Sequence, residues 1–550
     1  MYDEAHEDDL VPITERASST TRGLDIASAG EKFDIMARAE LEVFGGPFGA
    51  GLRDETFLHS LLTYVGNLNG ESSILLAGAG TSGRLCRLVT LAHTKNRVHR
   101  TRLVFSCVAG GTRSLWRAAP LAEDHRDDGI ADFRSLWEHA GSSQACVIGV
   151  TCGLSAAYIE GFLAGARTTS VSTAVIGFNH ARHRRVNLFI ESSPPTQLFN
   201  PIIGPEPVAG SVRMKGGTAT IIILFIVLDL LAERSSVPTS LLEKIEEYTM
   251  AIVSLERHRS LIAEVMEQAG HSIVSGGRIF LLGTGLFGAL CIFDAAECPP
   301  TFGAERHMCQ GFAEAGWEIL TREHQTPDAK YLPDEISFAH FARQILPGLN
   351  KNDTVVFVCE ANAIDRTVGL LDAIRRSPAS SSLIVTGRAD GPIPTSWPAS
   401  SIDLRDEVKR DECQLLAVRS LLNRISTGAF AIAGKLYTNR MIDVRITNRK
   451  LFHRAASIVA SLVPTDLVTA ANLVIRSIGT TSSVFIRADQ VPDDSLVNSA
   501  ANRRYVVPRA ILMGRFPHVS MGTIDEWLKR EPVIRKLIQD RSSSGGQDVL

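Results

Sequence analysis

The sequence predicts an α/β protein made of two tandem copies of one domain, each a mainly parallel sheet flanked by helices, followed by a C-terminal helical cap. Three observations predict this organisation. Short apolar runs alternate with helix-length segments, one set of motifs occurs twice, and the last part of the chain has helical spacing. Parallel strands are covered on both faces, which agrees with uninterrupted apolar runs such as ILLA and VVFV.

The duplication rests on four pairs of motifs that recur in the same order, about 205 to 211 residues apart. The first two pairs are SILLAGAGTSGRL (73–85) with RIFLLGTGLFGAL (278–290), and ACVIGVT (145–151) with TVVFVC (354–359). The other two are TAVIG (173–177) with LIVTG (383–387), and KGGTA (215–219) with STGAF (426–430).

From these matches we predict four parts of the chain. They are an N-terminal segment (1–45), the first copy (46–240), the second copy with a linker helix (241–410) and the helical cap (411–550). Because the duplication already supplies a pseudo-dimer, we expect the protein to be a monomer.

The composition is that of a globular chain. The 550 residues are 45% hydrophobic and 21% charged, which excludes a disordered or collagenous protein. A net charge of −3 creates no field that attracts nucleic acid or an anionic membrane, so neither is an expected partner. The longest apolar run, 219–228, is about half of the ~20 residues that span a bilayer, and we predict a buried helix there.

Cysteine usage and the N-terminus indicate the compartment. The nine cysteines form no CxxC pair, and many lie in apolar runs, which favours reduced buried thiols over disulfides or a metal site. Residues 1–9 are acidic and lack the apolar segment of a secretion signal. We therefore expect a cytoplasmic protein, with a nuclear location as the alternative, and neither a metal nor a cofactor.

The segment Gly78-Ala-Gly80-Thr-Ser-Gly83 matches GxGxxG between a strand and a helix, a pattern found at dinucleotide sites. Such a site also needs an acidic residue about 20 positions later to bind the ribose. No Asp or Glu occurs between Ser72 and Ala122, while eight Arg or Lys residues do. This context excludes NAD as the expected ligand.

A phosphate group suits the same loop better. Backbone N–H groups at a helix N-terminus favour an anion, and Thr81 and Ser82 add hydroxyl donors. A second strand ends in Thr151-Cys-Gly153-Leu-Ser155, and ligands of open α/β sheets lie beyond the carboxyl ends of the strands. The alternative is that both segments are ordinary tight turns whose hydroxyls cap helices.

The second copy carries a different loop, in which Leu286 and Phe287 replace the two hydroxyl residues. We expect this loop to pack in the core, which leaves one ligand site per chain.

Three segments resemble a known family: GAGTSGRL, GPEPVAGSVRMKGG (204–217) and ECPPTFG (297–303). They are similar to sugar isomerase (SIS) domains, and more narrowly to the N-acetylmuramic acid 6-phosphate etherases and the glucokinase regulatory proteins. The etherase corresponds to one copy and works as a dimer, whereas the regulatory proteins have two tandem copies and a helical lid. The resemblance extends from about residue 14 to about residue 540 and includes ISTGA (425–429) and ITNRKLFHR (446–454).

The resemblance implies a sugar phosphate bound between the two copies. The residues implied at the ligand are Gly80, Thr81, Ser82, Glu123, Thr151, Gly153, Ser155, Glu297, Lys450 and Arg454. Glu123 and Glu297 would contact the sugar, and Lys450 and Arg454 would come from the lid. Arg213 and Lys215 are implied to have a structural role near the pocket.

Two functions remain open. As a regulator, the protein would bind a hexose phosphate such as fructose 6-phosphate and change its affinity for a glucokinase or hexokinase. As an etherase, it would release lactate, with Glu297 as the acid and Glu123 as the base, since the first copy has Ala92 where the family has glutamate. A metabolite sensor with another partner is the third possibility.

Two departures from the vertebrate regulators bear on this choice. Pro300 stands where they have histidine, which puts recognition of fructose 1-phosphate in doubt. Their apolar docking loop for glucokinase corresponds here to Ser400-Ser-Ile-Asp403, where Ile402 is the only apolar residue.

Overall fold

The structure is a computed structural model. It describes residues 11–68, 73–95, 103–119, 121–141, 145–169, 171–188, 195–233, 238–321, 334–387, 401–405, 407–443, 446, 449–478 and 503–543.

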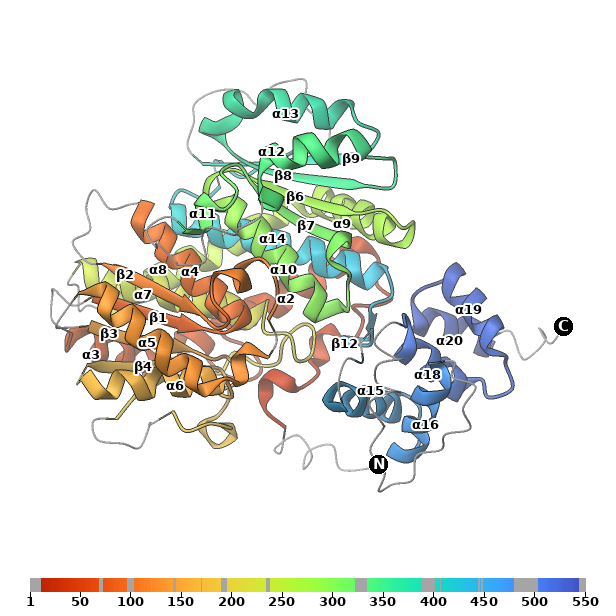
Figure 1. The fold of residues 1–550 in the computed structure, drawn as a ribbon, viewed down its shortest axis with the longest axis horizontal. Helices are drawn as coiled ribbons and strands as arrows, with labels where there is room; N and C mark the ends of the chain where they lie inside the picture. Colours follow the sequence, from red (N-terminus) through yellow and green to blue (C-terminus); the bar gives the residue numbers. More distant parts are fainter. Residues whose placement is uncertain are drawn as a thin grey trace.

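Two five-stranded parallel sheets confirm the predicted duplication (Figure 1). The first has the order β2-β1-β3-β4-β5, and the second has the order β10-β9-β8-β6-β7, which is the same order when the strands of the two copies are matched in turn. The strands of the first sheet are β1 (Ser73–Gly78), β2 (Val104–Val108), β3 (Ala145–Val150), β4 (Ser172–Ile176) and β5 (Gln197–Phe199). Those of the second are β6 (Ile279–Gly283), β7 (Cys309–Ala313), β8 (Thr354–Glu360), β9 (Ser380–Thr386) and β10 (Ser401–Asp403).

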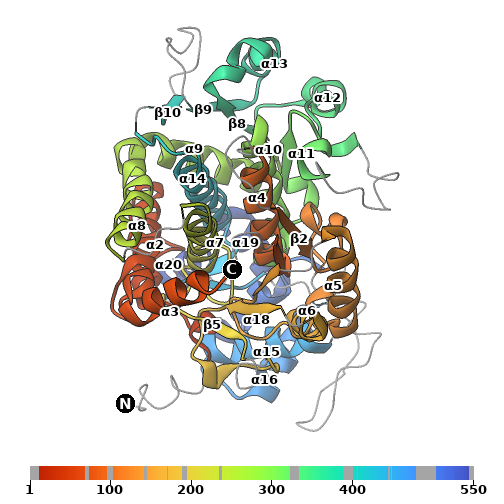
Figure 2. The ribbon, with the colours of Figure 1, turned by 90° about the vertical axis from the view of Figure 1, so that its left-hand side faces the viewer.

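Helices cover both faces of the sheets. The first copy contains α3 (Glu55–Gly66), α4 (Gly80–Lys95), α5 (Arg126–Ala140), α6 (Ala157–Ala166) and α7 (Lys215–Glu233). The second contains α8 (Pro238–Val253), α9 (Arg259–Val274), α10 (Gly285–Phe302), α11 (Glu318–Thr321), α12 (Phe338–His340), α13 (Ile364–Arg376) and α14 (Asp411–Ile432). The N-terminal segment contains α2 (Ala29–Leu41), which packs against α9 and α14. Alternate residues of β1 face opposite layers, since Leu75 packs with residues of α5 and α6 and Ile74 belongs to the central core. Figure 2 shows α5 and α6 together on one side of the first sheet.

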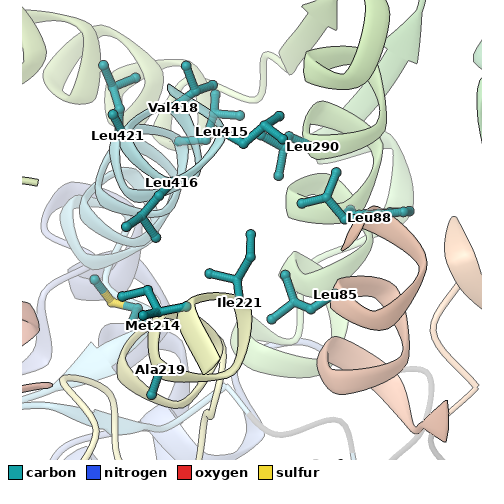
Figure 3. Packing of buried hydrophobic residues seen from close by; sticks show 14 of the residues in the cluster. Leu85, Leu88, Met214, Ala219, Ile221, Leu290, Leu415, Leu416, Val418 and Leu421 are labelled. Atoms are coloured by element: carbon teal, nitrogen blue, oxygen red, sulfur yellow. The ribbon is translucent and has the colours of Figure 1, made fainter. Parts of the chain in front are cut away.

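The central core lies where helices α4 and α7 of the first copy meet α10 and α14 of the second. Figure 3 shows apolar side chains of these four helices pointing toward one another, among them Leu85, Ile221, Leu290 and Leu416. The apolar run predicted to be a buried helix is α7. It is apolar enough to cross a membrane, but 94% of its most apolar 18-residue window is buried inside the protein.

Buried charges join the two copies across this core. Arg213, which precedes α7, donates from Nη2 to Asp294 Oδ1 on α10 (2.6 Å) and to Ser426 Oγ on α14 (2.6 Å). Glu40, on α2, accepts from Thr218 of α7 (2.7 Å) and from Arg424 of α14 (3.1 Å). Removing one partner of such a pair leaves an uncompensated buried charge, so these contacts fix the arrangement of the copies.

The C-terminal cap has its own core. Its helices are α15 (Arg449–Leu462), α16 (Leu467–Ser477), α18 (Val506–Arg515), α19 (Met521–Arg530) and α20 (Ile534–Ser543). A small hairpin of β11 (Leu436–Tyr437) and β12 (Arg440–Met441) precedes them.

Two expectations change in the fold. Helix α14, expected to begin the cap at 411, packs in the central core against α9 and α10, and the separate cap core starts at Ile442. The helical spacing predicts α14 correctly, but spacing alone does not indicate which domain a helix packs against. The fourth motif pair also differs in position, because Lys215 begins α7 whereas Ser426 lies near the end of α14.

Candidate functional site

The strands β1 and β3 end at the same edge of the first sheet, because Gly78 pairs with Val150 in a parallel ladder. Helix α4 begins directly after β1, and Gly80 takes a left-handed conformation with φ of +52°. A Cβ on Gly78 would lie 2.5 Å from the amide nitrogen of Gly83, so glycine is required for the helix to start this close to the strand. The unpaired N–H groups of the first helical turn therefore lie at this edge.

The turn after β3 is held by side chains. Thr151 Oγ1 accepts hydrogen bonds from the backbone N–H groups of Ser155 (3.2 Å) and Ala156 (3.3 Å). Asn179 Nδ2 donates to the carbonyl oxygen of Gly153 (3.0 Å) and to Thr14 Oγ1 (3.0 Å). Each polar group of this turn is thus fixed before a ligand binds.

A cavity of about 670 Å³ opens at this edge, between the first sheet and the cap. We call it the first cavity. Six residues predicted at the ligand line it: Ser82, Glu123, Thr151, Gly153, Ser155 and Arg454. They come from α4, the 3-10 helix at 122–124, the turn after β3 and helix α15 of the cap, so the fold brings together segments more than 300 residues apart in sequence.

Sequence reasoning missed four charged residues that line the first cavity: Glu15, Asp124, Arg185 and Arg440. Arg185 follows β4, which ends at the same sheet edge, so the argument applied to β1 and β3 could have found it. Nothing in the sequence signals Arg440, because it reaches the cavity through the hairpin of β11 and β12.

Thr81 and Glu297 are brought together, but beside the first cavity rather than in its lining. Thr81 Oγ1 donates to Glu297 Oε2 (2.6 Å), and Arg84 donates to Glu297 Oε1. All three line a separate space of about 30 Å³ between α4 and α10. Both oxygens of the Glu297 carboxylate therefore act as acceptors toward groups of the first copy.

The remaining two predicted residues lie at helix starts. Gly80 is the first residue of α4, and Lys450 is in the first turn of α15. The side chain of Lys450 is outside the described part of the chain.

Buried polar groups form the floor beneath the first cavity. Ser82 Oγ lies 3.5 Å from Cys152 Sγ, and the nine cysteines are free thiols, all buried except Cys107. The carboxylate of Glu206 accepts from the backbone N–H groups of Lys215 (3.0 Å) and Gly216 (2.7 Å) at the start of α7. Burial raises the pKa of Glu206 to about 7.

Arg213 and Lys215 have structural partners. The contacts of Arg213 with α10 and α14 are completed by Asn423 Oδ1, which accepts from Nε (2.9 Å). Lys215 Nζ donates to Glu42 (2.6 Å), the lysine side chain is fully buried, and burial lowers the pKa of Lys215. Neither side chain lines the first cavity.

The equivalent corner of the second copy has a different lining. Leu286 and Phe287 are both buried, as the sequence predicts for a loop that packs. A cavity of about 270 Å³ beside them is lined by Ala92 from the first copy and by the carboxyl side chains of Glu360, Asp411 and Glu412. We call it the second cavity.

Comparison with known proteins follows this architecture domain by domain. Residues 58–167 match the N-terminal SIS domain of glucokinase regulatory protein, 257–376 match its second SIS domain, and 438–538 match its C-terminal lid domain. The chain belongs to the glucokinase regulatory protein family. The cap described above is the lid of this family, and the two duplicated copies are its SIS domains.

Curated relatives agree with this assignment. The chain is 28% identical to glucokinase regulatory protein of Xenopus laevis, over 92% of this chain and 89% of the relative. It is 26% identical to the Homo sapiens protein, over 98% and 93%. N-acetylmuramic acid 6-phosphate etherase of Thermosynechococcus vestitus is 30% identical, over 42% of this chain and 74% of the etherase.

Proposed function

We propose that the protein binds a hexose phosphate, such as fructose 6-phosphate, in the first cavity and acts as a ligand-dependent regulator of a hexose kinase. The observation that carries the proposal is the lining of this cavity. It joins the open start of α4, four hydroxyl-bearing residues and arginines from both the SIS domain and the lid.

The phosphate end of the ligand would occupy the corner beside Ser82, Thr151 and Ser155. Hydroxyl groups and the N–H groups of a helix start are the usual partners of a phosphate. Arg185, Arg440 and Arg454 add positive charge around the same cavity, which favours a dianion further.

The sugar end would lie toward the carboxylates of Glu15, Glu123 and Asp124. Carboxylates accept hydrogen bonds from hydroxyl groups, so they can orient the sugar ring. Because they are anions, they do not neutralise the charge of the phosphate. Burial of polar groups without partners is costly, which makes such a site selective for ligands that carry both features.

Coupling to a partner would go through the lid. Arg454 and Ile458 of α15 and Arg440 of β12 line the cavity, so a bound sugar phosphate would contact the lid and favour one of its positions. A ligand that interacts differently with two lid positions shifts the equilibrium between them, and a kinase that prefers one position would respond.

The segment that corresponds to the vertebrate docking loop gives no support to a kinase contact at that place. Ile402, its one apolar residue, is in β10 and is fully buried against β9. A kinase would have to bind another surface of this protein.

The test is thermal unfolding with fructose 6-phosphate, using fructose as the control without phosphate. We expect the phosphorylated sugar to raise the melting temperature and Ser82→Glu to abolish the rise, because it places a carboxylate against the phosphate. Ser135→Glu makes the same charge change on the exposed face of α5 and should keep the rise. An undiminished rise in Ser82→Glu would place the ligand elsewhere.

The etherase relatives give a second candidate, with Glu297 as the acid and Glu123 as the base. D-lactate release from N-acetylmuramic acid 6-phosphate, lost in Glu297→Gln, would support it. Folded protein that binds sugar phosphate without lactate release would exclude it. The contacts of Glu297 with Thr81 and Arg84 favour the regulator, because both carboxylate oxygens are already engaged as acceptors.

A further inference from the structure

A further crevice lies between the two SIS domains, beside α10. This crevice has a volume of about 370 Å³. Its polar lining consists of Trp116 and Arg117 from the first domain and Arg306, Gln310, Glu335 and His340 from the second. It shares no lining residue with the first cavity.

The crevice concentrates positive charge. The guanidinium of Arg306 lies 4.3 Å from the ring centroid of Trp116, and Trp116 packs edge-to-face with Trp317 at 5.5 Å. Burial lowers the pKa of Arg306, and the charges of Arg117 and Arg113 lower it further, while Glu335 opposes them. The lining thus combines two arginines and one histidine with one carboxyl side chain.

These arginines are not used in ion pairs within the described part of the chain. The adjacent carboxylate of Glu305 is taken by Arg504 and His307, not by Arg306. The indole N–H of Trp116 is buried, and no described acceptor lies within hydrogen-bond distance of it. Both arginines of the lining are exposed to solvent, so their charges are available to an anion without the loss of an ion pair. The buried donor of Trp116 has no described acceptor, which raises the free energy of the empty crevice.

We propose that the crevice between Trp116 and Arg306 is a second ligand site, which takes a small doubly charged oxyanion, either a phosphate ester or a dicarboxylate. Arg306 and Arg117 bind its charged oxygens from opposite domains. Gln310 and His340 supply further donors, and the volume admits a compact metabolite but no macromolecule.

A ligand here would also act on the contact between α4 and α10. Arg84 Nε donates to the carbonyl oxygen of Leu115 (3.1 Å), the residue before Trp116, and Arg84 also pairs with Glu297. Pro299, two residues after Glu297, lines the crevice. A ligand in the crevice would therefore affect Arg84 and Glu297, which lie beside the first cavity. If it changes the affinity of the first cavity for its ligand, the ligand of the first cavity must change the affinity of the crevice by the same factor.

The test is a titration of the full chain at constant ionic strength, followed by tryptophan fluorescence, with inorganic phosphate and with succinate as separate probes. We carry it out in Ser82→Glu, so that phosphate in the first cavity does not contribute. The expected result is a saturable change in fluorescence with at least one probe. Saturation by phosphate alone indicates a phosphate ester, and saturation by succinate alone indicates a dicarboxylate.

Arg306→Gln should weaken this binding about tenfold or more, since it removes a charge-assisted pair worth roughly 1.5 to 3 kcal/mol. The control is Arg375→Gln, which makes the same charge change on the exposed face of α13 and should bind as the parent does. If Arg306→Gln lowers the melting temperature strongly, the exposed Arg117→Gln decides, with about threefold weaker binding expected. No saturable signal with either probe, or equal affinity in the crevice and control variants, would overturn the proposal.

Discussion

The turn between β1 and α4 and the turn between β6 and α10 have almost the same backbone. Gly80 has φ of +52° and Gly285 has φ of +50°. A Cβ on Gly78 would lie 2.5 Å from Gly83 N, and a Cβ on Gly283 would lie 2.5 Å from Gly288 N. The glycines therefore maintain the geometry of both corners, whatever the corners bind.

The side chains on these two backbones differ in kind. Ser82 faces the first cavity, whereas Phe287, at the matching position, is buried in the central core. The first cavity has three arginines as well as three carboxyl side chains, which leaves cations for a phosphate. The described lining of the second cavity has three carboxyl side chains and no arginine or lysine, so it repels a phosphate. Duplication has left one corner for ligand chemistry and the other for packing.

Each corner also receives a residue from the opposite copy. Glu297 of α10 contacts Thr81 and Arg84 of the first corner, and Ala92, at the matching position of α4, lines the second cavity. The two exchanged residues occupy matching positions, but only one of them carries a charge. If the two corners have separate roles, changes at the first corner should weaken the ligand response and changes at the second corner should not.

The largest effect on stability should come from removing a packed aromatic side chain at the second corner. Phe287→Ala should lower the free energy of unfolding by about 3 to 5 kcal/mol, because it leaves a cavity in the central core, and should keep the rise in melting temperature with fructose 6-phosphate. Ser82→Ala should change stability by less than about 1 kcal/mol and weaken the ligand response. Chemical denaturation and thermal unfolding check both; a folded Phe287→Ala without a ligand response would contradict the separation.

Breaking the contact between Glu297 and Arg84 should lower the free energy of unfolding nearly as much. Glu297→Gln removes the charge that pairs with Arg84, whose side chain is 3% exposed, and should destabilise the protein by about 3 kcal/mol in chemical denaturation. The matched control is Glu246→Gln, which breaks the exposed pair with Arg53 and should cost less than about 1 kcal/mol. Equal losses in the two variants would show that the Glu297 contact contributes no more than a surface pair.

The starts of α7 and α14 also differ, because Glu206 accepts a hydrogen bond from the first turn of α7 whereas α14 has no side-chain cap. Burial raises the pKa of Glu206 from 4.5 to about 7, so the folded state holds its proton more tightly than the unfolded state does. This contribution is complete below pH 4.5 and is lost as the pH rises to about 7. Urea denaturation at pH 5 and pH 7.5 should show a smaller pH dependence in Glu206→Gln than in the parent, by up to about 3 kcal/mol.

The smallest effect should come from the turn after β3. Thr151→Val removes the acceptor for the N–H groups of Ser155 and Ala156 and should cost about 1 to 2 kcal/mol while weakening the ligand response. Cys359→Val changes the matching position, which lies near the end of β8, and should leave the ligand response intact. Melting temperatures with and without fructose 6-phosphate compare the two variants, and a lost response in Cys359→Val would mean that the second corner contributes to binding.

The sequence predicts the duplicated sheets well, because each parallel strand is a buried apolar run followed by a glycine turn. It also predicts which residues gather at the first corner, since the carboxyl ends of parallel strands meet. It does not predict that Thr81 and Ser82 diverge, one toward Glu297 and one toward Cys152. Adjacent helical residues point about 100° apart, and the direction of the first turn depends on its packing.

The lid shows where local patterns are insufficient. Helix α14 and helices α15 to α20 all have helical spacing, and only tertiary packing assigns α14 to the central core. Arg440 reaches the first cavity because a two-stranded hairpin places it there, and no periodicity or motif marks that position.

The contacts of Arg213 and Glu40 have a consequence for how the chain is made. Both groups lie in the first 240 residues, yet their buried partners Ser426 and Arg424 belong to α14, which leaves the ribosome last among the described helices of the central core. At roughly 5 to 20 residues per second, α7 waits about 10 to 40 s for α14. During that interval the nascent first domain holds unpaired charges at its future interface, and its burial is completed only when the second domain has been synthesised.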